Sequence, residues 1–421
     1  MPPEVDLAVT NRPQTTQPRR RWVGTRRTMS LAVVIAIASS VAVTSAPRPM
    51  AASGGTGPAA CDIKSLTKNA TEGLKAYSWD GTKYLVNRED ANGIAQVYVA
   101  NAGSTDLTCI TCVARTGGPG ADRFKMQPNW HPSGKWIFMA VERDTYTVPP
   151  ILGGFRDYVE GQLQNGIWTN MWAVTPDGQQ WFRMTDFSSD PGKPDGFTGP
   201  AFTPDGKKAV WSQIVDGNIL VYFPFGRWEL TMADVDDSGS APRFSNLKNI
   251  TPTGMHWNEP GTFRDNETMV LSGSVEKDAQ GQDQYTLNIK TGQLINLTNT
   301  PTVWDEHGFF SPGGDKITFM SAYPYRSDPN TSKVLGIKTE FMMMNSDGSN
   351  LTQLTHFLQP GYPEYSATND GIAAIGVWHP DGRSMVLRRL RFPNYEDWAL
   401  EFEGRCSYRP AAPARVRIIS R

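Results

Sequence analysis

The chain has 421 residues, of which 39% are hydrophobic and 20% charged, so it can bury a large core. Its formal net charge is −1, from 41 basic and 42 acidic residues, and no overall field would drive it onto nucleic acid or an anionic membrane. Nucleic acid is therefore not expected as a partner.

The first sixty residues differ in kind from the rest. A basic stretch, "RRRWVGTRRT" (residues 19–28), runs into the apolar "MSLAVVIAIASSVAVTSA" (residues 29–46). This order is typical of an export signal, and small-residue sites such as "TSA" suit cleavage. Retained uncleaved, the same segment would anchor the protein in a membrane. We expect residues 1–60 to be an export signal and flexible linker, and the protein to be secreted or periplasmic.

Four cysteines, Cys61, Cys109, Cys112 and Cys406, agree with export, because an even number outside the cytoplasm indicates disulfides. Cys109 and Cys112 form a Cys-x-x-Cys pair, which in other settings binds zinc or exchanges thiols. No second Cys-x-x-Cys or Cys/His pair accompanies it in the sequence. Structural disulfides are the favoured interpretation.

One pattern then recurs: an aromatic residue, a Pro-Asp-Gly type turn and an alternating apolar strand, which together indicate a β-hairpin. Clear copies lie at residues 129–142, 201–213, 309–322 and 377–390, and eroded copies at 76–89 and 262–274. Downstream pairs such as "QYTLNIKTGQLINLT" (residues 284–298) complete four-stranded antiparallel units. The aromatic anchors, spaced 47 to 72 residues apart as in propeller blades, are Tyr77, Trp130, Phe202, Phe263, Phe310 and Trp378.

The segments "FSPGGDKITF" and "EFMMMNSDGSNLTQLT" resemble the repeat of the TolB-like, WD40-like (PD40) β-propeller family. That repeat is an aromatic-Ser-Pro-Asp-Gly hairpin followed by a strand, Asp-Gly-Ser and Leu-Thr. The resemblance runs from about Cys61 to Phe402 and implies an all-β, six-bladed propeller of four-stranded antiparallel blades over residues 61–405. Residues 406–421 are expected to form an irregular tail. The motif says little about function, because similar propellers serve as binding scaffolds, lyases and accessory domains of peptidases.

The last repeat supplies only three strands, and "CDIKSLT" (residues 61–67) is expected to provide the fourth. The N-terminal strand would then complete the last blade and remove exposed sheet edges. This closure would bring Cys61 close to Cys406 and leave Cys109 and Cys112 to pair with each other. The connectivity itself stays open at this point.

Long insertions between second and third strands, at residues 143–169, 215–228 and 323–338, are expected on one face of the propeller. They are rich in aromatic residues, which suit stacking on a sugar ring or packing against a protein partner. Equally, such loops need a small core of their own. The predicted ligand-binding residues on and near this face are Gln127, Trp168, Trp172, Trp228, Trp257 and Tyr323.

An acidic and histidine-containing cluster is predicted where the inner strands begin. His307 lies three residues before its anchor Phe310, and Glu306 and Glu259 lie one place earlier in their repeats. Imidazole with carboxylates can bind a divalent metal or act as general acid and base near neutral pH. The candidate catalytic residues are Glu259, Glu306 and His307, and the candidate metal ligands are His256, Glu306 and His307. A hydrogen-bonded structural cluster is the alternative.

A weaker similarity exists to oligogalacturonate lyases, propellers of related repeats with a metal held by histidines and a glutamine. This chain has fewer histidines there and six blades instead of seven, so no catalytic assignment is carried over. The sequence contains no Gly-x-Ser-x-Gly elbow, Walker loop or dinucleotide fingerprint. We expect a monomer that binds a glycan or an envelope or extracellular protein on its long-loop face. The alternative is an extracellular carbohydrate-active lyase or glycoside hydrolase.

Overall fold

The computed structural model describes residues 61–68, 73–144, 146, 156–187, 195–217, 226–275, 281–328, 331, 337–366, 371–391 and 394–406. The predicted export signal and linker, and all of the predicted tail except Cys406, lie outside these residues. Within the described ranges, no helix is long and apolar enough to cross a membrane.

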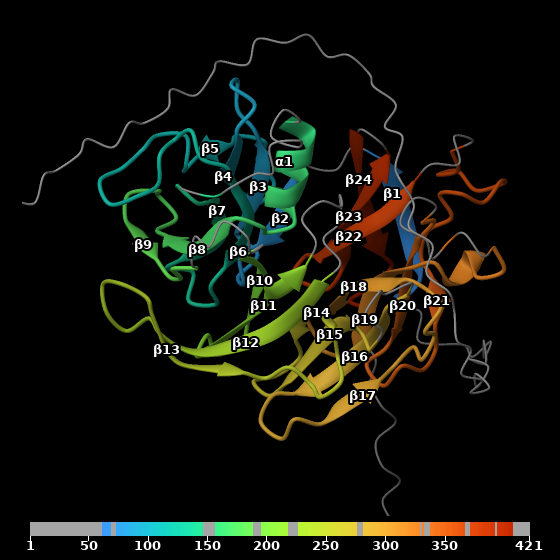
Figure 1. The fold of residues 1–421 in the computed structure, drawn as a ribbon. Coiled ribbons are helices and arrows are strands. Elements are labelled where there is room, and N and C mark those ends of the chain that lie inside the picture. Colours follow the sequence, from blue (N-terminus) through green and yellow to red (C-terminus); the bar gives the residue numbers. More distant parts are fainter. Residues whose placement is uncertain are drawn as a thin grey trace, which may run out of the picture. The chain divides into compact units, whose positions relative to one another are not determined.

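The described strands form six four-stranded antiparallel sheets in chain order (Figure 1). The first three blades are β2 (Leu74–Tyr77), β3 (Lys83–Glu89), β4 (Ala95–Asn101) and β5 (Thr108–Cys109); β6 (Lys125–Trp130), β7 (Ile137–Glu142), β8 (Thr169–Val174) and β9 (Trp181–Arg183); and β10 (Gly196–Phe202), β11 (Lys208–Gly217), β12 (Gly226–Asp236) and β13 (Arg243–Asn249). Helix α1 (Arg156–Gln164) lies between β7 and β8 in the chain.

The remaining blades are β14 (Trp257–Phe263), β15 (Thr268–Ser274), β16 (Asp283–Asn288) and β17 (Leu294–Asn296); β18 (Asp305–Phe310), β19 (Lys316–Ser321), β20 (Glu340–Asn345) and β21 (Thr352–Gln353); and β22 (Ile372–Trp378), β23 (Ser384–Arg391), β24 (Asn394–Phe402) and β1 (Ile63–Lys68). A short 3-10 helix, η2 (Tyr323–Tyr325), follows β19.

The first strand closes the last blade. β1 pairs antiparallel with β24, with Leu66 opposite Leu400, and Figure 1 shows blue β1 beside the red strands of that blade. Each inner strand contacts the next around the ring, and β22 contacts β2. Disulfides join Cys61 to Cys406 and Cys109 to Cys112. The predicted six-bladed propeller and its closing strand are confirmed, and the structure supplies the disulfide pairing that the sequence left open.

The turn chemistry explains why the Pro-Asp-Gly hairpin recurs. In the third blade, Asp205 Oδ1 accepts from the Thr203 hydroxyl at 2.7 Å and from the Lys207 backbone N–H at 3.0 Å. Gly206 follows with a φ of 70°, a left-handed conformation that glycine adopts without steric cost. The turn is thus fixed by local bonds and forces the next strand to fold back.

The Leu-Thr ending of each repeat is also structural. The Thr298 hydroxyl donates to Asp283 Oδ1 at 2.9 Å and accepts from the Gln284 backbone N–H at 3.1 Å. Thr355 makes the same two contacts, with Glu340 and the Phe341 N–H. These bonds tie the outgoing chain to the start of the third strand. The polar residues of this motif are therefore committed to the fold.

Apolar side chains fill the space between blades. Between the first and second blades, Leu85 and Val99 pack in one buried cluster with Ile137 and Met139. The repeat anchor Trp130 belongs to the same cluster and is 1% exposed. Burial of this kind supplies the main stabilisation of a propeller.

Candidate functional site

Each inner strand slips once in its register with the next strand, and this slip builds the candidate site. In β6 it lies between Met126 and Asn129, and in β18 between Glu306 and Phe309. Gln127 and His307 lie inside these bulges with left-handed φ values of 51° and 56°. Such a backbone costs a non-glycine residue on the order of 1 kcal/mol. The bulge breaks the alternation of side chains, so the neighbours Glu306 and His307 contribute to one cluster.

The cluster joins two adjacent blades. Glu259 comes from β14, and Glu306 and His307 come from β18, with one possible ligand atom of each within 4.8 Å of the others. His307 Nε2 lies 3.5 Å from Glu259 Oε1. His307 Nδ1 lies 2.8 Å from the carbonyl oxygen of Ala374 in β22. Because that carbonyl only accepts, Nδ1 carries a proton, and in the neutral ring Nε2 is the acceptor facing Glu259.

Close approach of β14 and β18 makes this contact feasible. A Cβ on Gly261 would lie 1.9 Å from the carbonyl oxygen of Gly308, so only glycine fits there. Thr262 Oγ1 accepts a hydrogen bond from the Phe310 N–H at 2.7 Å across the same interface. These residues bring the two inner strands within side-chain reach of each other.

The electrostatics of the cluster favour a shared proton. The side chains of His307 and Glu259 are 20% and 23% exposed. Burial, with a smaller contribution from the Glu306 carboxylate, raises the pKa of Glu259 to about 7. The neighbouring His307 opposes this rise. Burial lowers the pKa of His307, but the two carboxylates outweigh it and hold that pKa above its usual value. Near neutral pH the cluster can therefore exchange a proton at little cost.

No family model and no curated protein matches the chain. The chain is a six-bladed β-propeller. Its structural neighbours include TolB from Acinetobacter baumannii, at 13% identity over 82% of this chain and 65% of that one, with a TM-score of 0.42. A puromycin-hydrolyzing peptidase from Mycobacterium tuberculosis has 14% identity over 81% of this chain and 47% of the peptidase, with a TM-score of 0.44. Oligogalacturonate lyase in complex with manganese has 12% identity over 80% of this chain and 90% of the lyase, with a TM-score of 0.43. These likenesses concern the fold alone.

His256 is not a member of the donor cluster found among the described residues. Among the described residues, the group of donors close enough to share a metal contains Glu259, Glu306 and His307. His256 precedes β14, and its backbone N–H and carbonyl bond Ser274 and Trp228. The predicted metal set of His256, Glu306 and His307 stays a prediction, and the group brought together in the structure differs from it by containing Glu259 instead of His256.

Trp168 and Trp228 are each 1% exposed. They share a buried cluster with Leu163, Ile167 and Ile214. The Trp168 ring also stacks on Tyr146, with centroids 4.9 Å apart. The structure does not support the prediction that these two tryptophans bind a ligand, because the insertions use them as a core of their own.

The other predicted binding residues keep partly exposed side chains. Gln127 donates to the Gln164 carbonyl at the end of α1, at 2.7 Å, so the insertion lies at the level of the bulges. Trp172, Trp257 and Tyr323 are half-buried. The Arg326 guanidinium lies 4.0 Å from the Tyr323 ring centroid. Residues 147–155 and 218–225 of the predicted aromatic loops lie outside the described ranges.

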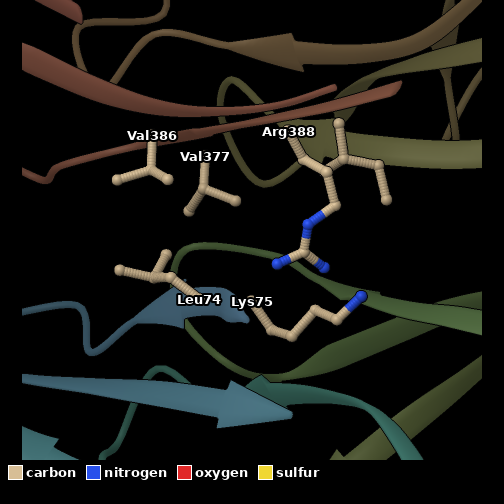
Figure 2. Close-up of a pocket in the computed structure, with 6 residues that line it drawn as sticks. Leu74, Lys75, Val377, Val386 and Arg388 are labelled. Carbon is tan, nitrogen blue, oxygen red and sulfur yellow. The ribbon is translucent and has the colours of Figure 1, made fainter. Parts of the chain in front are cut away.

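Sequence reasoning missed Lys75 and Arg388, which line a small pocket between the first and last blades with Leu74, Ile375, Val377 and Val386 (Figure 2). Lys75 lies at the register slip of β2, between Leu74 and Ala76. It stands two residues before the anchor Tyr77, whereas the other candidates stand three or four before theirs. Because of this shift, Lys75 does not share the distance from the aromatic anchor by which His307 was identified in the sequence.

Asp305 gives a test of pH dependence. It is 1% exposed and accepts from Thr300 Oγ1 at 2.6 Å and from the Ser321 hydroxyl. Burial raises its pKa from 3.8 to about 7, although these hydroxyls oppose the rise. The folded state thus binds the proton more tightly, and the stabilisation present below about pH 4 is lost as pH rises through about 7.

Asp305→Asn should flatten this pH dependence, because asparagine stays neutral. We expect the variant to gain on the order of 2 kcal/mol relative to wild type between about pH 5 and about pH 8, in urea unfolding at both values. The exposed Asp106→Asn variant is the control and should follow wild type. Parallel pH profiles for wild type and Asp305→Asn would show that Asp305 is already ionised in the folded protein.

Proposed function

We propose that this propeller is an exported ligand-binding protein whose binding centre is Glu259, Glu306 and His307, and that the centre holds a divalent cation. One observation carries the proposal: three donors from two neighbouring blades lie within 4.8 Å of one another. In addition, Glu259 Oε2 is buried and has no hydrogen-bond partner in the described part of the chain. A buried oxygen without a partner is costly unless it meets a cation or a proton.

The residues around the centre fit a metal site. One imidazole and two carboxylates suit first-row divalent metals. Ligating histidines commonly donate their other ring N–H to a carbonyl, as His307 does to Ala374. Trp304 Nε1 donates to Glu306 Oε2 at 2.8 Å and orients that carboxylate in the same way. A bound cation would act as a Lewis acid on a ligand oxygen.

The ligand classes proposed are a glycan or an envelope or extracellular protein. The half-buried rings of Trp172, Trp257 and Tyr323, with Gln127, offer aromatic and polar surface for either. Two disulfides support a location outside the cytoplasm, in agreement with the predicted export signal. Membrane attachment would require retention of the signal segment.

Metal analysis of the purified, untagged protein tests the proposal. We expect near-stoichiometric metal by inductively coupled plasma mass spectrometry after loading with Mn²⁺ or Zn²⁺ and desalting. His307→Ala and Glu306→Gln should weaken binding at least about 100-fold by calorimetry, because each removes a ligand. His256→Ala is the matched control and should bind like wild type. No metal in wild type, or equal binding in His307→Ala, would refute the metal centre.

A second function is favoured by one observation, the pKa of Glu259 raised to about 7. A carboxyl group with that pKa is suited to general acid and base catalysis at neutral pH. The alternative proposal is therefore a carbohydrate-active lyase or glycoside hydrolase. A polysaccharide panel would then show turnover that Glu259→Gln abolishes while the melting temperature is unchanged. Absence of turnover across uronic-acid and neutral polysaccharides would leave the binding function as the proposal.

A further inference from the structure

Lys75 is a basic residue of β2, the innermost strand of the first blade. Its side chain is half-buried and lines the pocket between β2 and the strands β22 and β23. Its ammonium makes no hydrogen bond or ion pair with any residue that the structure describes. Figure 2 shows the nitrogen ends of Lys75 and Arg388 on the same side of the pocket, away from Leu74, Val377 and Val386.

The nearby carboxylate is already committed. Arg388 Nε and Nη2 donate to the two oxygens of Asp397, both at 2.9 Å. Asp397 Oδ2 also accepts from the Gly73 backbone N–H at 2.8 Å. Asp397 is therefore held by a bidentate arginine and by the backbone, a strong and geometrically fixed arrangement. Two basic side chains, Lys75 and Arg388, line the pocket, and the carboxylate of Asp397 is bound to Arg388.

The charge of Lys75 is consequently poorly compensated. Burial and, to a smaller extent, the neighbouring charge of Arg388 together lower the pKa of Lys75 to about 7, against the opposing effect of Asp397. The pocket adjoins the acid and histidine centre, because Ile375 in its wall follows Ala374, whose carbonyl oxygen lies 2.8 Å from His307 Nδ1. An anion beside Lys75 would offset the desolvation of the ammonium and stabilise its charged form.

We propose that Lys75 is the anchor of an oxyanion subsite, which binds a carboxylate or phosphate group of a ligand whose other end lies at the Glu259, Glu306 and His307 centre. The inference deepens the proposed function and rests on it for the second contact. Lys75 supplies the hydrogen bonds, while Arg388, held by Asp397, supplies positive potential. The pocket itself has room for about one water molecule, so the anion would contact Lys75 from the side on which the nitrogen ends of Lys75 and Arg388 lie in Figure 2.

Protection of Lys75 from an amine-directed acylating reagent tests the subsite in the full chain. Labelling is quantified residue by residue by mass spectrometry, with inorganic phosphate or acetate up to tens of millimolar. We expect at least one anion to slow Lys75 labelling roughly tenfold at saturation. Lys290, whose side chain is 72% exposed, should be unaffected. Protection by one anion alone would identify the ligand group as phosphate or carboxylate.

Two results would overturn the inference. The first is that neither anion protects Lys75 from labelling. The second is that sodium chloride at matched ionic strength protects Lys75 equally, which would indicate screening only. Lys75→Met should also lower calorimetric anion affinity roughly tenfold, and Lys75→Arg should stay within a few fold of wild type, because it keeps the charge. Equal affinity in wild type and a folded Lys75→Met variant would contradict the subsite.

The metal centre and the anion subsite can fail separately. In His307→Ala, metal binding should be lost while Lys75 remains protected by the anion. In Lys75→Met, anion binding should be lost while the metal content stays that of wild type. Anion protection in a protein that binds no metal would refute the metal centre alone, and metal binding without protection would refute the subsite alone.

Discussion

Replacing Cys61 and Cys406 with alanine is expected to lower the free energy of unfolding by about 3–5 kcal/mol. This disulfide spans 345 residues of sequence, so its loss releases a very large loop in the unfolded chain. It also releases the end of β1, which is held in its blade through pairing with β24. Equilibrium urea unfolding of wild type and variant measures the difference.

The second disulfide provides the matched control. Cys109 and Cys112 are three residues apart, so their bond closes a very short loop. Replacing both with alanine removes the same chemical groups and should cost at most about 2 kcal/mol. Equal losses in the two double variants would contradict the explanation by loop length.

Trp168→Ala is expected to lower the free energy of unfolding by about 3–5 kcal/mol, as for other large core truncations. Its ring is 1% exposed and stacked on Tyr146, and the variant would leave a cavity between α1 and the bulge of β6. Trp168 has a left-handed φ of 59°, which alanine does not relieve. Thermal and urea unfolding give the size of the loss.

Trp172 is the control for a ligand role of the aromatic residues. It is half-buried and lies edge-on to Trp181, with centroids 6.3 Å apart. Trp172→Ala should cost less stability than Trp168→Ala, while Trp168→Phe should recover part of the loss by keeping an aromatic ring. If Trp168→Ala kept wild-type stability and lost affinity for metal or anion, the ring would be a ligand contact after all.

The fold was predictable because its information is local and repeated. Each hairpin carries its own aromatic anchor and polar turn, and six copies define the ring without any knowledge of distant contacts. The missing strand of the last repeat pointed to β1, and that closure placed Cys61 near Cys406. Periodicity and simple counting were sufficient for the ring and its closure, whereas the disulfide connectivity came from the structure.

The site was predictable only where it followed the same period. Glu306 and His307 lie at a bulge whose distance from the anchor recurs between blades, so alignment by Phe310 located them. Composition could not show that Trp168 turns inward, because that depends on how an insertion packs upon itself. Lys75 escaped notice because the slip in β2 falls closer to its anchor. Contacts between blades, such as Lys75 with the last blade, have no local sequence signal.

Closure by β1 also imposes an order in time. β1 is synthesised before every other described strand, yet its partner β24 is synthesised last. During synthesis, β1 can pair with β24 only after the final blade has emerged from the ribosome. A chain interrupted before β24 would keep an open sheet edge and a reduced Cys61, both recognisable to quality-control proteases and thiol oxidases. Joining of the first and last cysteines therefore marks a chain whose translation has run to the end of the ring.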